Sequence, residues 1–218
     1  MQKPSHVMKT ENDSDFEIKV YQGEMGMPLV PTVDEWVIYH AKKFPFLYAN
    51  QGEIIPHYIF FEDPQGFVLF AEKAKTQVAL LAAIPMDSPH MNAANYNPFS
   101  EMSSYTDLGF NPEKIMYVAV FFIADAERGN RHLILEMYQQ AAKLATEKGK
   151  KQFCYFTTVR EDNHPLKPLN YVPPEPWEEL QIPVHSMGIH VNFTWPTFQA
   201  DGSVKDQLNT QALYFLDI

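Results

Sequence analysis

The chain has 218 residues, of which 45% are hydrophobic and 14% aromatic, and its 27 acidic and 17 basic side chains give a formal net charge of −10. This length and composition suit one well-packed domain. Because an acidic surface repels nucleic acid and anionic lipid, we expect neither as a partner.

The segments of the chain that are most apolar do not indicate a membrane protein. The runs at 78–86 and 115–124 are shorter than the roughly 20 residues that span a bilayer, and residues 1–15 lack the apolar core of a signal peptide. The single cysteine, Cys154, excludes an internal disulfide and fits a reducing compartment. We therefore expect a cytoplasmic protein with a polar N-terminal tail at 1–15 and a single domain at 16–218.

The first half of the domain is predicted to begin with a strand followed by a helix. FEIKVYQ (16–22) alternates like a strand, and TVDEWVIYHAKKF (32–44) carries its acidic residues early and its lysines late, as a helix dipole favours. The spacing of Val33, Trp36, Val37, Tyr39 and Phe44 is roughly helical, which supports a helix over this segment.

The segments that follow the first helix are less regular. HYIFFED (57–63) is apolar, and residues 66–85 are predicted to form a strand–turn–strand hairpin broken at EKAKTQ. Residues 87–112 are rich in Asn, Ser and Pro, and a loop of that length in a compact domain is usually functional or disordered.

The second half contains the strongest pattern. Ile115–Ala124 is apolar throughout, as in a strand buried on both faces, and 130–148 predicts a helix that Gly149 ends. Another strand at 151–159 makes this a β-α-β crossover, so the two strands should pair in parallel. Because 189–198 and 210–218 look like a final antiparallel pair, the predicted class is α+β with a mixed sheet.

Cys154 lies within QFCYF, which reads as part of the strand at 151–159. We interpret it as an inert core thiol, because a reactive thiolate needs polar and basic surroundings.

The order of strand, Arg-Gly turn, helix of about five turns, strand and closing hairpin resembles the Gcn5-related N-acetyltransferase (GNAT) superfamily. Three segments resemble the FPYLYDG, RP-x-DHP and FSW segments of one bacterial branch: FPFLYANQGE (44–53), REDNHPLKPLNYVPPEPWEEL (160–180) and NFTWPTF…ALYFLDI (192–218). The resemblance covers nearly the whole chain from Phe16. It implies a GNAT-like, mostly antiparallel sheet with a central parallel pair of strands that splay apart, and helices on both faces.

The resemblance also implies an activity: direct transfer of an acetyl or other acyl group from CoA to an amine, with acetyl-CoA as co-substrate. In GNAT proteins the splayed strand contacts the pantetheine arm, and the turn after it binds the pyrophosphate. A phosphate site at this turn is also physically reasonable, because the unpaired N–H groups and the dipole of a helix N-terminus bind phosphate well. Matching the turn residue by residue implies a cofactor-binding set of Ile123, Ala124, Arg128, Gly129, Asn130, Arg131, His132 and Leu133.

The turn departs from the family pattern Arg/Gln-x-x-Gly-x-Gly/Ala at its two small-residue positions, which hold Arg131 and Leu133. Arg131 would either add charge to a phosphate contact or fill the groove, and Leu133 would add bulk. The strand glutamate of the related branch corresponds here to Ala119-Val120-Phe121. Three hypotheses stay open: an N-acyltransferase, a GNAT-shaped binding or regulatory protein without turnover, or a purely structural partner protein that makes its contacts through the loop at 87–112.

Acyl transfer to an amine needs a group that removes a proton and an acid for the leaving thiolate. In many GNAT proteins the acid is a tyrosine beyond the second parallel strand, which implies Tyr171, with His164 nearby. The alternatives are packing for Tyr171 and mere orientation for His164, which Pro165 holds extended. Tyr48, after the first helix, would face either the substrate or the core.

Asp125 and Glu127, at the end of the apolar strand, would either act through water or be solvated carboxylates beside Arg128. The scattered histidines and the lack of a Cys–His cluster predict no metal site. The expected partner is a small-molecule amine, for which a negatively charged protein is suited, and a homodimer is compatible with the sequence.

Overall fold

Eight β-strands form one mixed sheet in the computed structural model, in the order β1-β2-β3-β4-β5-β6-β8-β7. The structure describes residues 6–8, 15–43, 56–94, 98–99, 109–158, 184–198, 201 and 203–218. The strands are β1 His6–Met8, β2 Glu17–Tyr21, β3 Phe67–Lys73, β4 Thr76–Pro85, β5 Ile115–Ile123, β6 Gln152–Thr158, β7 Val184–Phe198 and β8 Val204–Asp217. All neighbouring pairs are antiparallel except β5 and β6, which are parallel. The predicted α+β class with a mixed sheet is confirmed.

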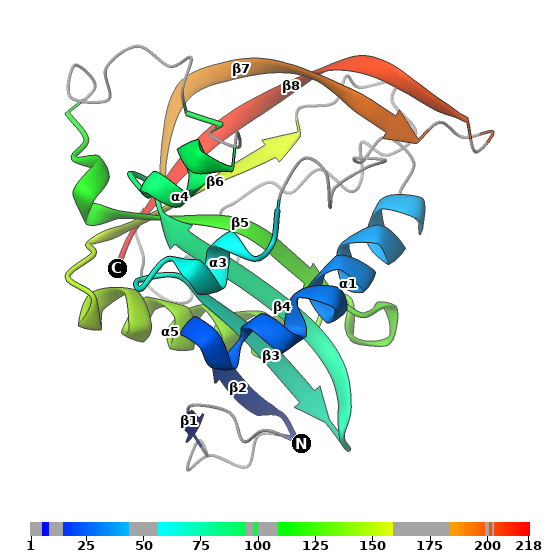
Figure 1. Ribbon diagram of the computed structural model, residues 1–218, viewed down its shortest axis with the longest axis vertical. Helices are drawn as coiled ribbons and strands as arrows, with labels where there is room; N and C mark the ends of the chain where they lie inside the picture. Colours follow the sequence, from blue (N-terminus) through cyan, green and yellow to red (C-terminus); the bar gives the residue numbers. More distant parts are fainter. Residues whose placement is uncertain are drawn as a thin grey trace.

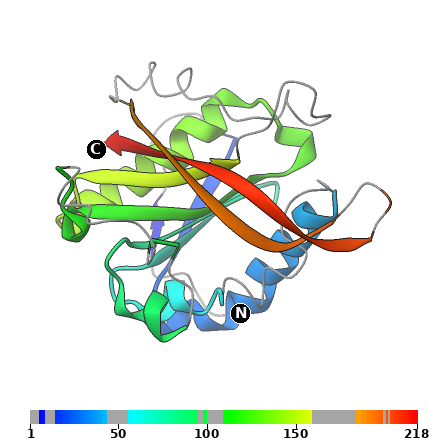
Figure 2. The ribbon, with the colours of Figure 1, turned by 90° about the horizontal axis from the view of Figure 1, so that it is seen from above.

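Helices cover both faces of this sheet, as expected. The α-helices are α1 Val30–Lys43, α3 Ile59–Glu62, α4 Pro89–Ala93 and α5 Arg131–Glu147. Short 3-10 turns are η1 Gly23–Met25, η2 Met27–Leu29, η4 Pro112–Lys114 and η5 Asp125–Glu127. Figure 2 shows α5 on one face of the sheet and α1, α3 and α4 on the other. Among the described helices, none has a stretch long and apolar enough to cross a lipid bilayer.

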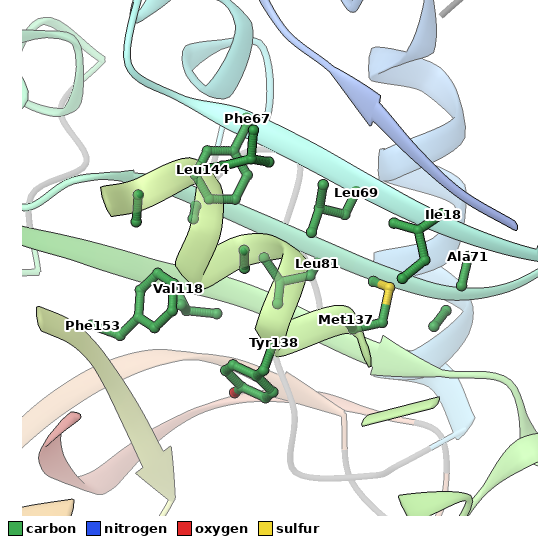
Figure 3. Packing of buried hydrophobic residues seen from close by; sticks show 14 of the residues in the cluster. Ile18, Phe67, Leu69, Ala71, Leu81, Val118, Met137, Tyr138, Leu144 and Phe153 are labelled. Atoms are coloured by element: carbon green, nitrogen blue, oxygen red, sulfur yellow. The ribbon is translucent and has the colours of Figure 1, made fainter. Parts of the chain in front are cut away.

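Each face of the sheet carries its own hydrophobic core. On one face, Met137, Tyr138 and Leu144 of α5 pack against strand residues that include Leu81 and Val118 (Figure 3). On the other face, side chains of α1, α3 and α4 pack against the opposite sides of the same strands; they include Val33, Val37, Phe60 and Met91. Burial on both faces explains why β4 and the first half of β5 read as continuous apolar runs.

A β-bulge interrupts the regular alternation of β5. Val118 pairs with Ala83 and Val120 with Ala82, so Ala119 is an extra residue on the β5 side. Val118 belongs to the core under α5, whereas Ala119 and Val120 both face the core under α1. A bulge of this kind bends the strand that carries it.

The bend separates β5 from β6. The two strands are paired only at Ile115, Met116 and Tyr117 of β5, after which β6 continues alongside β8 and β5 alongside β4. Figure 1 shows the two strands diverging toward their C-terminal ends. This is the splayed parallel pair that the GNAT resemblance implies, and it is confirmed.

Several elements differ from their predicted form. The apolar segment 57–63 holds the short helix α3, because Ile59, Phe60 and Phe61 are buried side by side in one helical turn rather than on alternating faces. The final hairpin is longer than predicted, since β7 begins at Val184 and β8 at Val204. Within the predicted polar tail, His6–Met8 pairs with β2. On the predicted first helix, now α1, Tyr39 is 53% exposed, because the buried stripe of α1 is narrow and centred on Val33 and Val37.

Leu133, in the first turn of α5, packs in the core between this helix and the sheet, and its side chain is fully buried. We expect Leu133→Ala to lower the free energy of unfolding by about 2–4 kcal/mol, as buried leucine truncations do. Leu208→Ala is the matched control, because Leu208 is 63% exposed and its truncation should change the free energy by less than about 0.5 kcal/mol. Urea denaturation measures both, and equal losses would contradict this packing.

Candidate functional site

The turn between β5 and α5 is built on one glycine with a left-handed backbone. Gly129 has φ +76°, a conformation that costs an L-residue about 1–2 kcal/mol. A Cβ added there would meet nothing within 4 Å, so the backbone conformation and not crowding requires glycine. The turn is therefore open to its surroundings at this position.

The protein itself uses part of the hydrogen-bonding capacity of this turn. The N–H groups of Arg128 and Asn130 donate to the carbonyls of Asp125 and Glu127, at 3.3 and 3.0 Å. Asn130 is the N-cap of α5, and its Oδ1 accepts from the N–H of Leu133 at 3.2 Å. Within the described part of the chain, no hydrogen bond is recorded for the N–H of Gly129. The donors that remain for an anion are thus fewer than the sequence implies, and they include the N–H of Gly129.

The two residues that replace the family's small residues have different environments. Leu133 is fully buried against the sheet, so its bulk lies in the core and not in the turn. Arg131 and His132 lie on the exposed surface of the first turn of α5, where His132 Nε2 is 3.1 Å from Oε1 of the buried Glu136. Ile123 and Ala124, at the end of β5, are half-buried.

Ion pairs balance the charges of the turn. The Arg128 guanidinium is 2.9 Å from Asp125 Oδ1, and Lys73 of β3 is 3.0 Å from Glu127 Oε1. Asn130 Nδ2 donates to the other oxygen of Glu127 at 2.8 Å. The hydrogen bond from Asn130, followed by the one from Lys73, lowers the pKa of Glu127 below its ordinary value. Glu127 is therefore a bound structural carboxylate and not a solvated one, whereas Asp125 is paired with Arg128 as the sequence suggested.

A pocket of about 270 Å³ lies between α1 and the end of β5, lined by Glu35, Trp36, Tyr39, Ala124 and Asp125. We call it the aromatic pocket. Hydrogen bonds hold both of its rings: Trp36 Nε1 donates to Gln77 Oε1 at 3.1 Å, and Tyr39 Oη donates to Asp125 Oδ2 at 3.2 Å. Figure 1 shows α1 passing beside the end of β5.

Sequence reasoning missed this pocket because it placed Trp36 and Tyr39 on the first helix without assigning them to any site. Glu35 and Tyr39 are four residues apart and so share one face of a helix. An acidic residue beside a tyrosine on that face was the available signal that the face is not buried. The partner residues on β4 and at Asp125 come from distant parts of the chain and carry no local signal.

A second polar pair lies on another flank of α1. His57 is almost completely buried, its Nδ1 is hydrogen-bonded to Oδ1 of Asp34, and its ring stacks on Phe60 with 6.2 Å between centroids. His57 Nε2 is also buried, and none of the residues that the structure describes hydrogen-bonds to it. Burial lowers the pKa of His57 below 6.5, against a smaller opposing effect of Asp34. Because only one ring nitrogen is satisfied, the neutral imidazole is the form that the fold favours.

The remaining candidate residues are distributed as follows. Cys154 is fully buried and burial raises the pKa of its thiol well above the ordinary value, in agreement with an inert core thiol. Tyr48, His164 and Tyr171 lie outside the described residues. Among the residues that the structure describes, no group of three or more His, Cys, Asp or Glu side chains is arranged to hold a metal ion.

Comparison with solved structures finds the same fold in two kinds of protein. The AHL synthase LasI is similar at 11% sequence identity with a TM-score of 0.52, over 93% of this chain and 89% of that one. A GNAT-family acetyltransferase from Streptococcus pneumoniae is similar at 9% identity with a TM-score of 0.50, over 93% and 99% of the two chains. No protein-family model matches the chain, and no curated protein matches it by sequence. At these identities the likeness shows the fold, which is GNAT-like.

The N-cap at Asn130 gives a direct prediction for the start of α5. We expect Asn130→Ala to lower the free energy of unfolding by about 1 kcal/mol, because the N–H of Leu133 loses its acceptor. Asn130→Ser, which keeps a capping oxygen, should lose only a few tenths of a kcal/mol. Urea denaturation distinguishes them, and an alanine variant as stable as the serine variant would show that the cap contributes nothing.

The His57–Asp34 pair predicts a dependence of stability on pH. Since the folded pKa lies below the unfolded one, the unfolded chain takes up a proton below about pH 6.5 that folded His57 does not. The free energy of unfolding should therefore fall as the pH falls through this range, by up to about 1.4 kcal/mol per pH unit from this group.

His57→Phe keeps a ring against Phe60 and should remove this contribution, so its stability should change less between pH 7 and 5 than that of the natural chain. His132→Gln is the control, because the His132 side chain is 60% exposed. Denaturant unfolding at several pH values measures the slopes, and identical slopes for the natural chain and His57→Phe would disprove the assignment.

Proposed function

We propose that the chain is an N-acyltransferase that moves an acetyl or other acyl group from CoA directly to the amine of a small acceptor in the cytoplasm. The observation that supports this most is the divergence of β5 from β6 just before a strand–turn–helix unit. After Tyr117 the edge of β5 that faces β6 is no longer used by that strand. An extended ligand with amide groups, such as the pantetheine arm, is suited to bind along such an edge.

The proposed binding of the donor follows the direction of β5. The pantetheine arm would run along the strand end at Ile123 and Ala124, and the diphosphate would lie over the turn at Gly129. The N–H groups at the start of α5 and the positive end of its dipole would bind this anion, with Arg128 and Arg131 as the cations nearest in sequence. The pairing of Glu127 with Lys73 and of Asp125 with Arg128 neutralises the two carboxylates that would otherwise repel it.

The proposed chemistry is a single displacement. The amine nitrogen attacks the thioester carbon, a C–N bond forms as the C–S bond breaks, and the amine loses a proton while the CoA thiolate gains one. We propose Tyr171 as the acid for the thiolate, His164 as the second catalytic residue and Tyr48 as a substrate contact. Direct transfer is favoured over a covalent enzyme intermediate because the single cysteine is buried with a raised pKa.

A binding or regulatory protein is the second candidate, and one observation favours it. The bend of β5, where the related branch carries a glutamate, holds Ala119 and Val120 facing the core under α1. Without a carboxylate at this bend, removal of the amine proton would depend on other groups.

Acetyl-CoA binding tests the proposal, with two glycines as a matched pair. Gly129 and Gly149 have φ of +76° and +75°, both with open space at the Cβ position, at opposite ends of α5. We expect acetyl-CoA at 100 times its Kd to stabilise the natural chain by about 2.7 kcal/mol. Gly129→Ala should weaken binding several-fold, whereas Gly149→Ala should cost a similar amount of stability without changing the affinity.

Thermal unfolding with and without acetyl-CoA measures binding, and release of free thiol with a set of amines measures transfer. Absence of any stabilisation would overturn both candidate functions. Stabilisation without thiol release for any amine would favour the binding protein.

A further inference from the structure

We infer that the aromatic pocket binds an organic cation, a small ammonium compound with an apolar body. The inference extends the proposed function, because this ammonium compound would be the acyl acceptor. It rests on the shape, the rings and the charges of the pocket, each of which is independent of how CoA binds.

The aromatic walls of the pocket are held in place before any ligand arrives. The polar end of the Trp36 indole is fixed to Gln77 of β4, and the indole packs edge-on against Phe70, 6.5 Å between centroids. The hydroxyl of Tyr39 is fixed to Asp125. Rings tethered at their polar ends offer π-electron surface without further loss of side-chain freedom on binding. Such surfaces attract ammonium groups, most strongly when the ring is an indole.

The charges of the pocket select a cation over an anion. Two carboxylates, Glu35 and Asp125, line it, and none of its described lining residues is basic. Asp125 is neutralised by Arg128 at 2.9 Å. For the Glu35 carboxylate, by contrast, the described residues provide no recorded hydrogen bond or ion pair. Glu35 thus leaves the pocket with a net negative charge, and the formal net charge of −10 adds a long-range attraction for cations.

The size and place of the pocket limit the ligand further. Its volume of about 270 Å³ lies just below the usual range of ligand pockets, about 300–1,000 Å³, so it suits a small amine and not a peptide. Ala124, which forms part of its wall, is also the residue that follows β5. A cation in the pocket would therefore lie beside the strand proposed to carry the acyl donor.

Calorimetric titration of the full chain without CoA tests the site itself. The probe is 2-phenylethylammonium, and 2-phenylethanol is the neutral analogue of the same shape. We expect the ammonium to bind between roughly threefold and thirtyfold more tightly than the alcohol, as cation–π attraction and a carboxylate provide. Equal affinities, or no binding of the ammonium at millimolar concentration, would overturn the inference.

Variants locate the binding. Glu35→Gln should weaken ammonium binding without changing alcohol binding, and Trp36→Leu should weaken both. Trp36→Phe keeps a ring in case the leucine variant fails to fold, and should have an intermediate effect. Glu24→Gln is the matched control, because Glu24 is an exposed acid of η1 that is not among the lining residues. An equal loss in Glu24→Gln and Glu35→Gln would show only a general charge effect.

Failure of this inference and failure of the proposed function give different results. If the ammonium binds as described but thiol release is absent, the site stands and the transferase does not. If transfer proceeds and Glu35→Gln leaves the KM for the amine unchanged, the transferase stands and the acceptor binds elsewhere.

Discussion

β5 contains one extra residue, Ala119, at a β-bulge. There the strand bends away from β6 and stays paired with β4, and the candidate site depends on this bend. Before the bulge the strand is buried on both faces and paired on both edges. After it, β6 no longer pairs with β5, and the strand ends in a turn and a helix. The bulge thus lets β5 diverge from β6 while Val118 and Val120 still pack on opposite faces of the sheet.

The two sides of the turn after β5 have opposite electrostatic character. On the α5 side, helix N–H groups and Gly129 present partial positive charge, and ion pairs neutralise the nearby carboxylates. On the α1 side, Glu35 and two tethered rings present negative charge and π-electron surface. Such a division would let an anionic donor and a cationic acceptor approach the same strand end from different sides, so that each is repelled from the other's position.

Much of the fold could be predicted from the sequence, for identifiable reasons. The strand at 115–123 and the helix after it have long periodic patterns, and their order alone requires a parallel pair. The short helix at Ile59–Glu62 could not be predicted, because three consecutive buried residues fit a strand as well as one helical turn. In the candidate site, the turn at Gly129 could be identified because only glycine adopts its backbone conformation easily. Trp36 and Tyr39 could not, because an amphipathic pattern does not say which aromatic residues at the border of a stripe are covered.

The sequence by itself determined the class of the sheet, the crossover through α5 and the position of the turn, since these depend on periodicity and on glycine, which act over a few residues. It also indicated the state of Cys154, which lies between the aromatic residues Phe153 and Tyr155 of a strand. Only the tertiary structure decided that Leu133 points into the core and that Glu127 is held by Lys73 of β3. It alone brought α1 beside the end of β5 to form the aromatic pocket. These features depend on contacts between elements distant in the chain, such as Lys73 with Glu127 and Tyr39 with Asp125. A local sequence pattern does not show which distant elements will pack together.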